Sequence, residues 1–497
     1  MTASQMGVFL GHELSGFPQV YNGSDYWLIK GGVDVSCFSQ AACQVVAEAS
    51  ALHIRLYQDG HEVRQTLEPG EAFELEFVDF SSIPEPLATA QRYMFGDTEQ
   101  ACDLFTFPLF RFVLIRLSPS EFIFYQRYHH IVQDGLGSHL IIHRLAEVYT
   151  ALLSNQESPA AYFGDFKELV LADAAYRQSL KFERDRDYWS SRFQDVPEPL
   201  SLARKDAPLS KTCRHRKAFS SAMVALLHKS PEKLGCSFSQ LLVALTCMYL
   251  YKMTGQQELV IGLPVTGRVG RAQRNIPGLM SNILPIRLTL LPKHSLQDVL
   301  SKVRAEIKGT LLHQQYRYED VLRDLNLLAA QQELFKTTVN IERFGKTPFF
   351  GEAVASPNNI ANGPAKDLNI FFFCDDATEN IILGMDANTL LYDEPQLESY
   401  TEGLQDFFSR VLSNPQSPVG LFNLLSPQEV QSTLVELNQT DCELPCLMLP
   451  ELFEAQVERS PEALALGYGD EQVTYRQLNE RVNRLACLLL ELGVSRG

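Results

Sequence analysis

Long apolar runs, basic patches and paired cysteines are the features that this sequence of 497 residues has least of. The longest apolar stretch, near residues 241–251, is too short to cross a bilayer. Residues 1–16 lack the basic and apolar regions of a secretion signal. The formal net charge is -17 and the one basic cluster covers residues 214–217, which argues against nucleic acid and anionic membrane surfaces as partners.

The ten cysteines are scattered along the chain, and none forms a Cys-x-x-Cys pair. Several lie within apolar stretches, where a free cysteine behaves as a small hydrophobic residue. Reduced, buried thiols are therefore expected rather than a disulfide framework or a zinc site. Together with the lack of a targeting segment, this pattern predicts a soluble cytoplasmic protein.

The composition that remains is that of a globular protein with more than one core. Hydrophobic residues make up 45% of the chain and charged residues 21%, which is close to the globular average. A length of 497 residues favours two to four folding units of about 100 to 200 residues each.

Strand and helix patterns alternate through two halves of the chain, which predicts an α/β fold. Two apolar runs, 109–117 and 121–131, are separated by a Ser-Pro-Ser turn and predict a hairpin, and helical spacing follows it. The polar segment 156–211 separates this half from a second half of similar style. The expected boundaries are a first lobe over about 1–175, a second over about 176–428, a linker over 429–447 and a further helical unit over 448–497.

The most informative local feature is the pair of histidines, His129 and His130, at the end of the second run. Adjacent strand residues face opposite sides, so the two imidazoles cannot bind one metal ion together, and no metal site is expected. Asp134 and Gly135 then form a turn into a helix, whose N-terminus favours developing negative charge. His130 is thus a candidate base beside a site that favours an anion. The alternative is a packed, hydrogen-bonded core histidine.

The run from His129 to Gly135 resembles the HHxxxDG signature of the condensation domains of nonribosomal peptide synthetases, in the fold family of chloramphenicol acetyltransferase. Other segments resemble further motifs of that family, in the family's own order: 3–9, 52–56, 163–166, 261–268, 278–287 and 313–316. The chain departs from the family at His53, where arginine is frequent, and at Gly137, where serine is usual. Segments 126–128 and 313–316 are similar to those of siderophore synthetases.

The resemblance implies a two-lobed chloramphenicol acetyltransferase-like pseudo-dimer with a central tunnel. The implied reaction is attack of a carrier-bound acceptor amine on a carrier-bound donor thioester, which forms an amide. His130 is the implied catalytic residue, either as a general base or as a group that positions the amine. The implied supporting residues are His129, Asp134, Gly135, Arg287, Arg55 and Asn282.

Each supporting residue has an expected role. Asp134 is expected to be structural and paired with Arg287 or Arg55, because a buried carboxylate needs a partner. Gly135 is expected to offer a backbone contact near the oxyanion. Asn282 is expected to hold a loop and strand over the substrate channel, with an ordinary core role as the alternative.

Residues 452–478 resemble the beginning of an adenylation domain and stop before any glycine-rich phosphate loop, and the chain also lacks a Gly-Gly-x-Ser carrier motif. The resemblance therefore implies that this chain binds no cofactor and that 4'-phosphopantetheine arrives on donor and acceptor carrier (thiolation) domains, with an adenylation domain downstream. Three alternatives stay open: a free-standing acyltransferase using coenzyme A thioesters, a non-catalytic docking module, and an epimerisation domain, which would normally follow a carrier domain.

Overall fold

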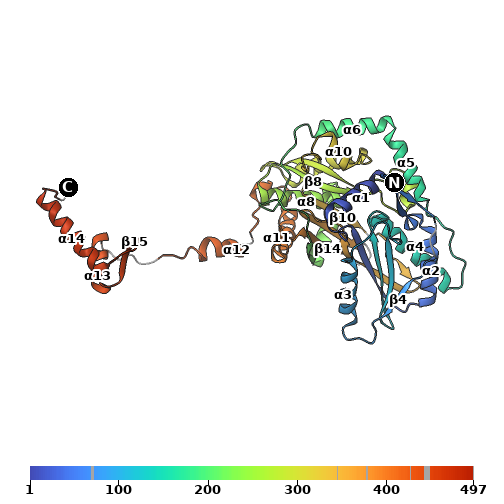
Figure 1. The fold of residues 1–497 in the computed structure, drawn as a ribbon, viewed down its shortest axis with the longest axis horizontal. Coiled ribbons are helices and arrows are strands. Elements are labelled where there is room, and N and C mark those ends of the chain that lie inside the picture. Colours follow the sequence, from blue (N-terminus) through green and yellow to red (C-terminus); the bar gives the residue numbers. More distant parts are fainter. Residues whose placement is uncertain (69–71, 344, 376–378, 426, 442–447, 496–497) are drawn as a thin grey trace. The chain divides into compact units, whose positions relative to one another are not determined.

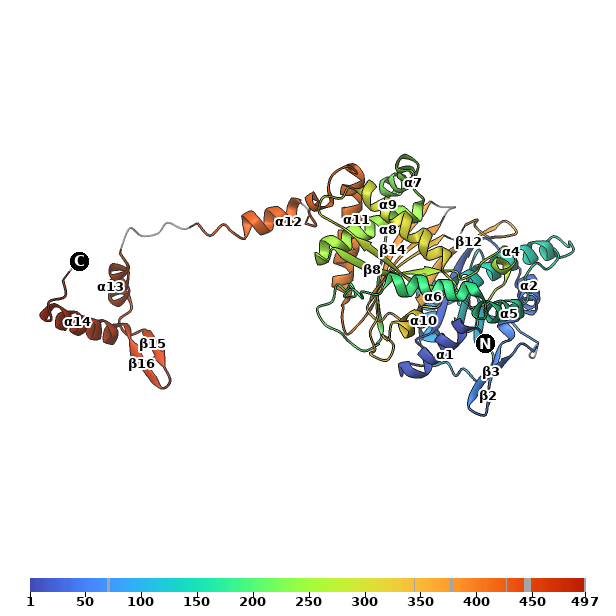
Figure 2. The ribbon, with the colours of Figure 1, turned by 90° about the horizontal axis from the view of Figure 1, so that it is seen from above.

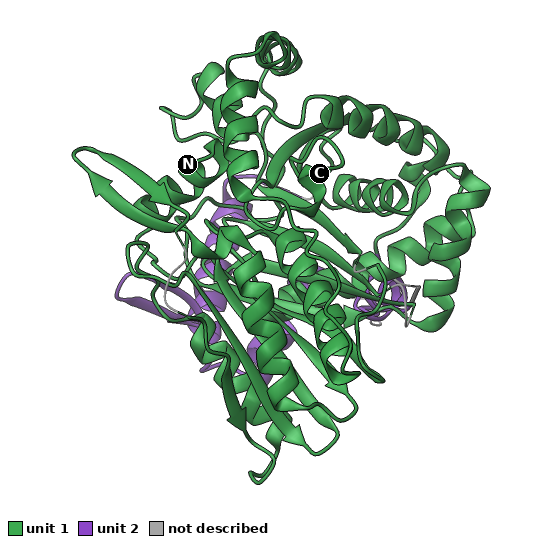
Figure 3. Ribbon diagram, turned by 90° about the vertical axis from the view of Figure 1, so that its right-hand side faces the viewer, with its two compact units in different colours: residues 1–424 green, residues 425–497 purple. Residues whose placement is uncertain are grey.

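The computed structural model describes residues 1–68, 72–343, 345–375, 379–425, 427–441 and 448–495. The chain forms two compact units, Met1–Leu424 and Leu425–Gly497, shown in green and purple in Figure 3. The first unit contains two six-stranded sheets and the HHxxxDG turn.

The first sheet has the strand order β11-β12-β1-β6-β5-β4. Its strands are β1 (Asn22–Lys30), β4 (Glu76–Asp79), β5 (Phe110–Ser118), β6 (Glu121–His129), β11 (Phe349–Phe350) and β12 (Ala353–Asn362). Helices α2 (Val35–Glu48) and α4 (Gly135–Leu153) share an apolar core with one face. Helix α3 (Pro86–Thr98) packs on the other face.

Strand β6 follows the alternation that the sequence predicts. Phe122, Phe124 and Tyr128 join the core on the α4 side, whereas Ile123 and Tyr125 join the core on the α3 side. The chain leaves the sheet directly after this strand and enters α4 (Figure 1).

The second sheet has the strand order β7-β14-β13-β10-β8-β9. Its strands are β7 (Thr212–Ala218), β8 (Glu258–Val265), β9 (Asn282–Thr289), β10 (Thr337–Arg343), β13 (Leu368–Asp375) and β14 (Asn380–Asn388). Its largest apolar core lies against α7 (Ser221–Leu234), α8 (Phe238–Thr254), α9 (Leu296–Leu312) and α11 (Glu394–Ser413). The two sheets with their helices form the two halves of an α/β unit.

Strands β11 and β12 belong to the first sheet although they occur late in the chain (Figure 2). Strand β12 pairs antiparallel with β1 over eight residue pairs, from Gly23↔Asn362 to Lys30↔Val354. A division near residue 175 therefore does not separate the two sheets. The sequence did not indicate this crossing, because the run Ser-Pro-Asn-Asn within β12 lacks the apolar alternation of a strand.

Further elements frame the first unit: α1 (Ala3–Ser15), the hairpin of β2 (Arg55–Asp59) and β3 (Glu62–Thr66), α5 (Phe166–Arg177), α6 (Leu180–Arg192) and α10 (Tyr318–Asp324). The second unit contains α12 (Pro427–Gln431), α13 (Leu449–Arg459), the hairpin of β15 (Leu464–Tyr468) and β16 (Glu471–Thr474), and α14 (Tyr475–Glu491). The expected linker thus begins within a helical segment, and residues 442–447 lie outside the described residues.

In the parts of the chain that the structure describes, no single helix is both long and apolar enough to cross a membrane. Helices α7 and α8 meet that criterion only as a pair, and they are bent by 103° at their junction.

Candidate active site

His130 follows the last residue of β6, at the point where the chain turns toward α4. Its Nδ1 lies 3.3 Å from the carbonyl oxygen of Gln133, so this nitrogen carries the proton and donates it. Burial lowers the pKa of His130, whereas the charge of Asp134 and the carbonyl groups of Gln133 and Asn362 raise it. The effect of burial is the larger, so the pKa lies below its usual value. The imidazole is therefore neutral near pH 7.

Gly363 covers the His130 ring, and sequence reasoning missed it. A Cβ atom at this position would lie 3.1 Å from both Cδ2 and Nε2 of His130. The φ angle of Gly363 is 85°, a conformation that other residues rarely adopt. The segment after β12 thus brings backbone from the crossing strand to the Nε2 edge of the histidine.

His129 faces a different set of groups from His130, as the strand alternation predicts. Its Nδ1 accepts a hydrogen bond from the backbone N–H of Ile131 at 3.1 Å, so Nε2 carries the proton and donates it to Nδ1 of His12 at 3.2 Å. Burial, followed by the nearby His12 and His130, lowers the pKa of His129 well below its usual value. His129 therefore stays neutral and fixes the backbone beneath the turn.

Asp134 joins the HHxxxDG turn to the loop before β9. Its carboxylate accepts hydrogen bonds from the backbone N–H groups of Met280 at 3.0 Å and Ser281 at 3.1 Å. It also caps α4 by accepting from the N–H of Gly137 at 3.0 Å. Burial raises the pKa of Asp134, but the charge of Arg268 and these hydrogen bonds outweigh it and hold the pKa below its usual value.

The expectation that Arg287 or Arg55 pairs with Asp134 is wrong, because Arg268 does so. Arg268 Nη1 lies 2.8 Å from Oδ2 and Nη2 lies 3.2 Å from Oδ1. The Arg268 side chain is fully buried, and Nη2 also donates to the carbonyl of Gly278 at 2.7 Å. Arg268 ends the family-like run 261–268, so the sequence signal was present but was not assigned to this role.

Arg287 and Arg55 have other partners. Arg287 forms ion pairs with Asp195 at 2.8 Å and Glu258 at 2.5 Å, which tie β9 to the end of α6 and to β8. Arg55 lies over the ring of Phe107, 4.2 Å from its centroid. Neither arginine is brought to the histidine turn by these contacts.

Asn282 holds the start of β9 against the segment before α10. Its Nδ2 donates to the carbonyl groups of Gln314 at 3.1 Å and Tyr316 at 2.8 Å, and its Oδ1 accepts from the N–H of Tyr318 at 3.3 Å.

Gly135, at the first position of α4, is exposed and has open space beside its Cα atom.

Gly137 explains one departure from the family pattern. A Cβ atom here would lie 3.0 Å from the backbone nitrogen of Gly278. The absence of a side chain lets the first turn of α4 approach the loop that Arg268 and Asp134 hold.

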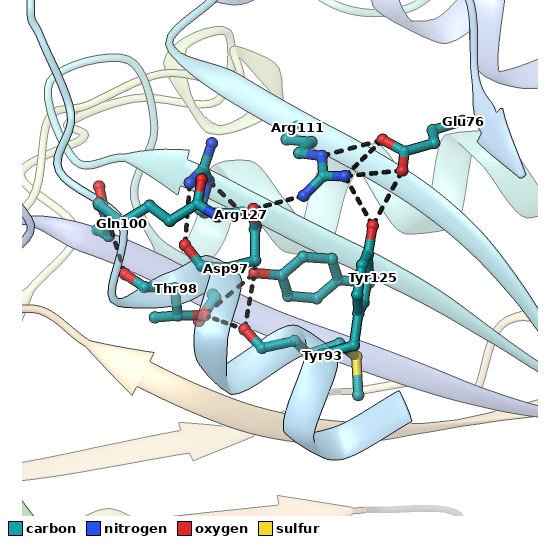
Figure 4. A network of polar contacts seen from close by, with 11 residues as sticks. Glu76, Tyr93, Asp97, Thr98, Gln100, Arg111, Tyr125 and Arg127 are labelled. Atoms are coloured by element: carbon teal, nitrogen blue, oxygen red, sulfur yellow. Dashed lines mark hydrogen bonds and ion pairs between the residues drawn. The ribbon is translucent and has the colours of Figure 1, made fainter. Parts of the chain in front are cut away.

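The opposite face of β6 carries a polar network that fixes α3 to the sheet (Figure 4). The buried Asp97 accepts hydrogen bonds from Arg111 and from Tyr125 at 2.9 Å, and lies 3.3 Å from Arg127 Nε. Arg111 also forms an ion pair with Glu76 of β4 at 2.7 Å. This network stiffens β6, which ends at His129 directly before His130.

Two pockets reach the neighbourhood of the turn. The first is lined in part by Val20, Arg214 and Gly363, the glycine that covers His130. The second is lined in part by Gly267 and Met280, whose N–H group binds Asp134. Within the described residues, no group of three or more histidine, cysteine or acidic side chains is arranged to hold a metal ion.

Two sheets joined by a crossing strand, with the HHxxxDG turn at the end of one strand, define an acyltransferase of the chloramphenicol acetyltransferase-like class. The family model described as "Condensation domain" matches residues 1–434, and the model described as "AMP-binding enzyme" matches residues 453–497. The chain therefore belongs to the condensation domain family of nonribosomal peptide synthetases, and its residues 453–497 match the start of an adenylation domain.

Individual relatives agree with this assignment. The chain is 32% identical over 495 residues to a dimodular nonribosomal peptide synthase of Bacillus subtilis, with 99% of this chain and 21% of the relative covered. It is 28% identical over 505 residues to enterobactin synthase component F of Escherichia coli, with 100% of this chain and 39% of the relative covered. The chain thus spans well under half the length of these curated relatives.

Solved structures agree as well. The starter condensation domain of rhizomide synthetase, in complex with C8-CoA, superimposes with a TM-score of 0.81 at 32% identity, covering 86% of this chain and 97% of that one. The first condensation domain of the calcium-dependent antibiotic synthetase, in complex with a substrate analogue, gives a TM-score of 0.79 at 29% identity, with 86% and 99% covered. The α/β fold and the family predicted from the sequence are confirmed.

Proposed function

We propose that this chain joins a donor acyl group and an acceptor aminoacyl group, each carried as a thioester on the phosphopantetheine arm of a carrier domain, during the synthesis of a nonribosomal peptide in the cytoplasm. The observation that carries the proposal is the neutral His130, whose Nδ1 is tied to the carbonyl of Gln133 so that Nε2 is left as a proton acceptor. The family assignment supports the reaction type.

The proposed step needs little covalent chemistry from the protein. The acceptor amine attacks the donor carbonyl carbon, a carbon–nitrogen bond forms, and the carbon–sulfur bond to the donor arm breaks. His130 Nε2 receives the proton that the amine loses and returns it to the departing thiolate, so no charge accumulates. Alignment of the two arms supplies much of the rate. A positioned base adds about 10² to 10⁴-fold.

The surrounding residues have supporting roles in this proposal. Asp134 and Arg268 hold the turn against the loop before β9, which keeps His130 at the end of its strand. The N–H of Gly135, at the exposed N-terminus of α4, is oriented by the helix to favour the oxyanion. The two pockets, which share no lining residue, are the proposed approaches of the two arms.

The direct experiment uses donor and acceptor carrier domains loaded with acyl groups and detects the amide product by mass spectrometry. Product on the acceptor carrier, and unloaded thiol on the donor carrier, are the expected results. Hydrolysis of both thioesters without an amide would contradict the proposal. Segments 126–128 and 313–316 resemble those of siderophore synthetases, whose donors are often aryl acids, so an aryl donor belongs in the first panel.

A second candidate is transfer of the donor directly from coenzyme A, without a donor carrier. It is favoured by the similarity to a starter condensation domain whose solved structure contains C8-CoA. Parallel reactions with the same acyl group on a carrier domain and on coenzyme A separate the two candidates. Equal or faster reaction of the coenzyme A thioester would establish the second.

A further inference from the structure

The face of the second sheet that points away from its helices is polar. Neighbouring strands place Arg214, Asp386 and Asn369 in one row, and Arg216 lies two residues along β7. Glu342 lies on the same face of β10. The alternate residues of these strands fill the apolar core against α8 and α11. A polar face of this kind normally lies at the protein surface, so its position in the interior needs a reason.

This polar face meets a polar row of the first sheet. Gln126, Asp25 and Asn359 are in register across β6, β1 and β12. Arg216 Nη2 donates to Asn359 Oδ1 at 3.2 Å, which joins the two sheets. The pocket that reaches Gly363 is also lined by Arg214, so this region connects to the neighbourhood of His130.

We call the side chains of Asp25, Gln126, Arg214, Arg216, Glu342 and Asp386 the inter-sheet cluster. The cluster approaches the candidate site at Asp25, which accepts a hydrogen bond at 2.7 Å from Ser138 in the first turns of α4. Tyr128 lies two residues after Gln126 on the same face of β6. Its ring packs edge-on against the ring of His130, with the centroids 5.9 Å apart.

Several groups of the inter-sheet cluster are incompletely paired. Gln126 is 0% exposed and its Oε1 has no hydrogen-bond partner. Asp386 is 1% exposed, and neither carboxylate oxygen accepts a hydrogen bond, although Arg214 Nε lies 3.3 Å away. Buried polar atoms are nearly always hydrogen-bonded, so the unpaired atoms of a cluster that reaches the first pocket through Arg214 indicate a polar ligand.

The charges of the inter-sheet cluster do not balance. Asp25 accepts hydrogen bonds from Ser138 Oγ at 2.7 Å and from Gln126 Nε2 at 3.4 Å. Glu342 accepts one from Asn340 Nδ2 at 2.8 Å. Among the described residues, the ion pairs of Arg214 and Arg216 go to Asp386. Burial raises the pKa of Asp25 and of Glu342 to about 7. When ionised, three carboxylates face two guanidinium groups, which leaves one uncompensated negative charge.

We propose that the inter-sheet cluster recognises the ammonium group of a basic side chain on one of the two acyl groups joined at His130. One ammonium group neutralises the excess charge and supplies donors to Asp25, Glu342 and the unpaired Gln126 oxygen. A long alkyl chain supplies neither a positive charge nor hydrogen-bond donors, so burying such a chain against the inter-sheet cluster is unfavourable. This inference rests on the proposed condensation function and names the substrate class.

The test compares lysyl with norleucyl thioesters on carrier domains, because norleucine has nearly the same shape and no ammonium group. Each is supplied to the full chain in turn as donor and as acceptor, with a glycyl thioester as the fixed partner, and single-turnover rates are followed by mass spectrometry. The expected result is a lysyl preference of at least about 10-fold in one of the two positions, as expected for a charged hydrogen bond of about 1.5 to 3 kcal/mol.

Asp25→Asn and Glu342→Gln are expected to bring the lysyl to norleucyl ratio to within about 3-fold, since each removes a carboxylate without changing shape. Glu352→Gln, an exposed position in the turn between β11 and β12, is the matched control and should keep the wild-type ratio. The ratio is measured within each variant, so partial loss of folded protein does not affect it.

The outcomes separate this inference from the proposed function. Amide product at equal or higher rate from norleucyl in both positions would overturn the inference and leave the condensation function intact. An unchanged ratio in Asp25→Asn and Glu342→Gln would also overturn it. Absence of amide from every substrate pair with the wild-type chain would instead contradict the proposed function.

Discussion

At the scale of single residues, the role proposed for His130 depends on its neutral form, and its environment determines that form. The Gln133 carbonyl binds Nδ1, and burial disfavours the imidazolium. The two neighbouring histidines differ in role because adjacent strand residues contact different groups, with His12 bonded to His129 and Gly363 covering His130. Sequence spacing alone was sufficient to predict this division.

The protonation of His130 is expected to have a midpoint below the usual value of 6.5. Burial lowers the pKa, so as the pH falls through 6.5 the ring stays neutral, and it gains its proton only at lower pH. NMR of ¹³C-labelled imidazole groups measures this, and the spectrum of His130→Gln assigns the resonance. A midpoint at or above 6.5 would contradict the geometry of the site.

Arg268 is expected to be essential for folding stability rather than for the chemical step. Arg268→Gln leaves the buried Asp134 carboxylate without its cation and should cost about 3 to 5 kcal/mol in the free energy of unfolding. Adding Asp134→Asn should recover part of this loss. Arg116→Gln, which breaks a half-exposed pair with Asp79, is the control and should cost about 1 kcal/mol or less. Urea unfolding measures all four proteins, and equal costs for the two arginines would refute this role.

The pairing of Asp134 shows where sequence reasoning stopped at the residue scale. A buried carboxylate at the turn required a cation, and this part of the prediction was right. Several arginines in family-like segments could have provided the cation. Their distance from Asp134 along the chain does not tell which of them pairs with it. The choice depends on how the loop before β9 folds back over α4, which is a long-range feature.

At the scale of elements, the hairpin of β5 and β6 and the helix α4 were predictable because each has a regular apolar period. Strands β11 and β12 were not, because β12 is stabilised by pairing with β1 rather than by its own pattern. Strand β7 was missed for a similar reason. The composition of its run Arg-His-Arg-Lys is typical of a solvent-exposed segment rather than of a strand inside a sheet. In the structure it carries part of the inter-sheet cluster.

Helix α3 is expected to depend on the Asp97 network for its attachment to the sheet. Asp97→Asn removes the charge that Arg111 and Arg127 share and should lower the free energy of unfolding by about 2 to 3 kcal/mol, since both arginines keep partial contact with water. Glu76→Gln, at the exposed end of the network, should cost about 1 kcal/mol or less. Hydrogen exchange should speed up in Pro86–Thr98 for Asp97→Asn alone, and unchanged exchange there would contradict the anchoring role.

At the scale of the whole molecule, the first unit contains its own cores, whereas the second exposes an apolar face on α14 that includes Leu485, Leu488 and Leu489. Residues 1–434 alone are therefore expected to melt at the same temperature as the first unit within the full chain and to form amide at the same rate. Calorimetry and the carrier assay check this, and loss of the fold on removal of residues 435–497 would contradict the independence of the unit.

The central claim is that His130 takes part in amide formation through Nε2, and single-turnover rates on preloaded carrier domains test it most directly. His130→Ala and His130→Gln should both react about 10² to 10⁴-fold more slowly than the unchanged chain, with binding of the carriers retained. His61→Gln, at an exposed position, serves as the control and should react at the unchanged rate. A His130→Ala protein that forms amide as fast as the unchanged chain would contradict the account.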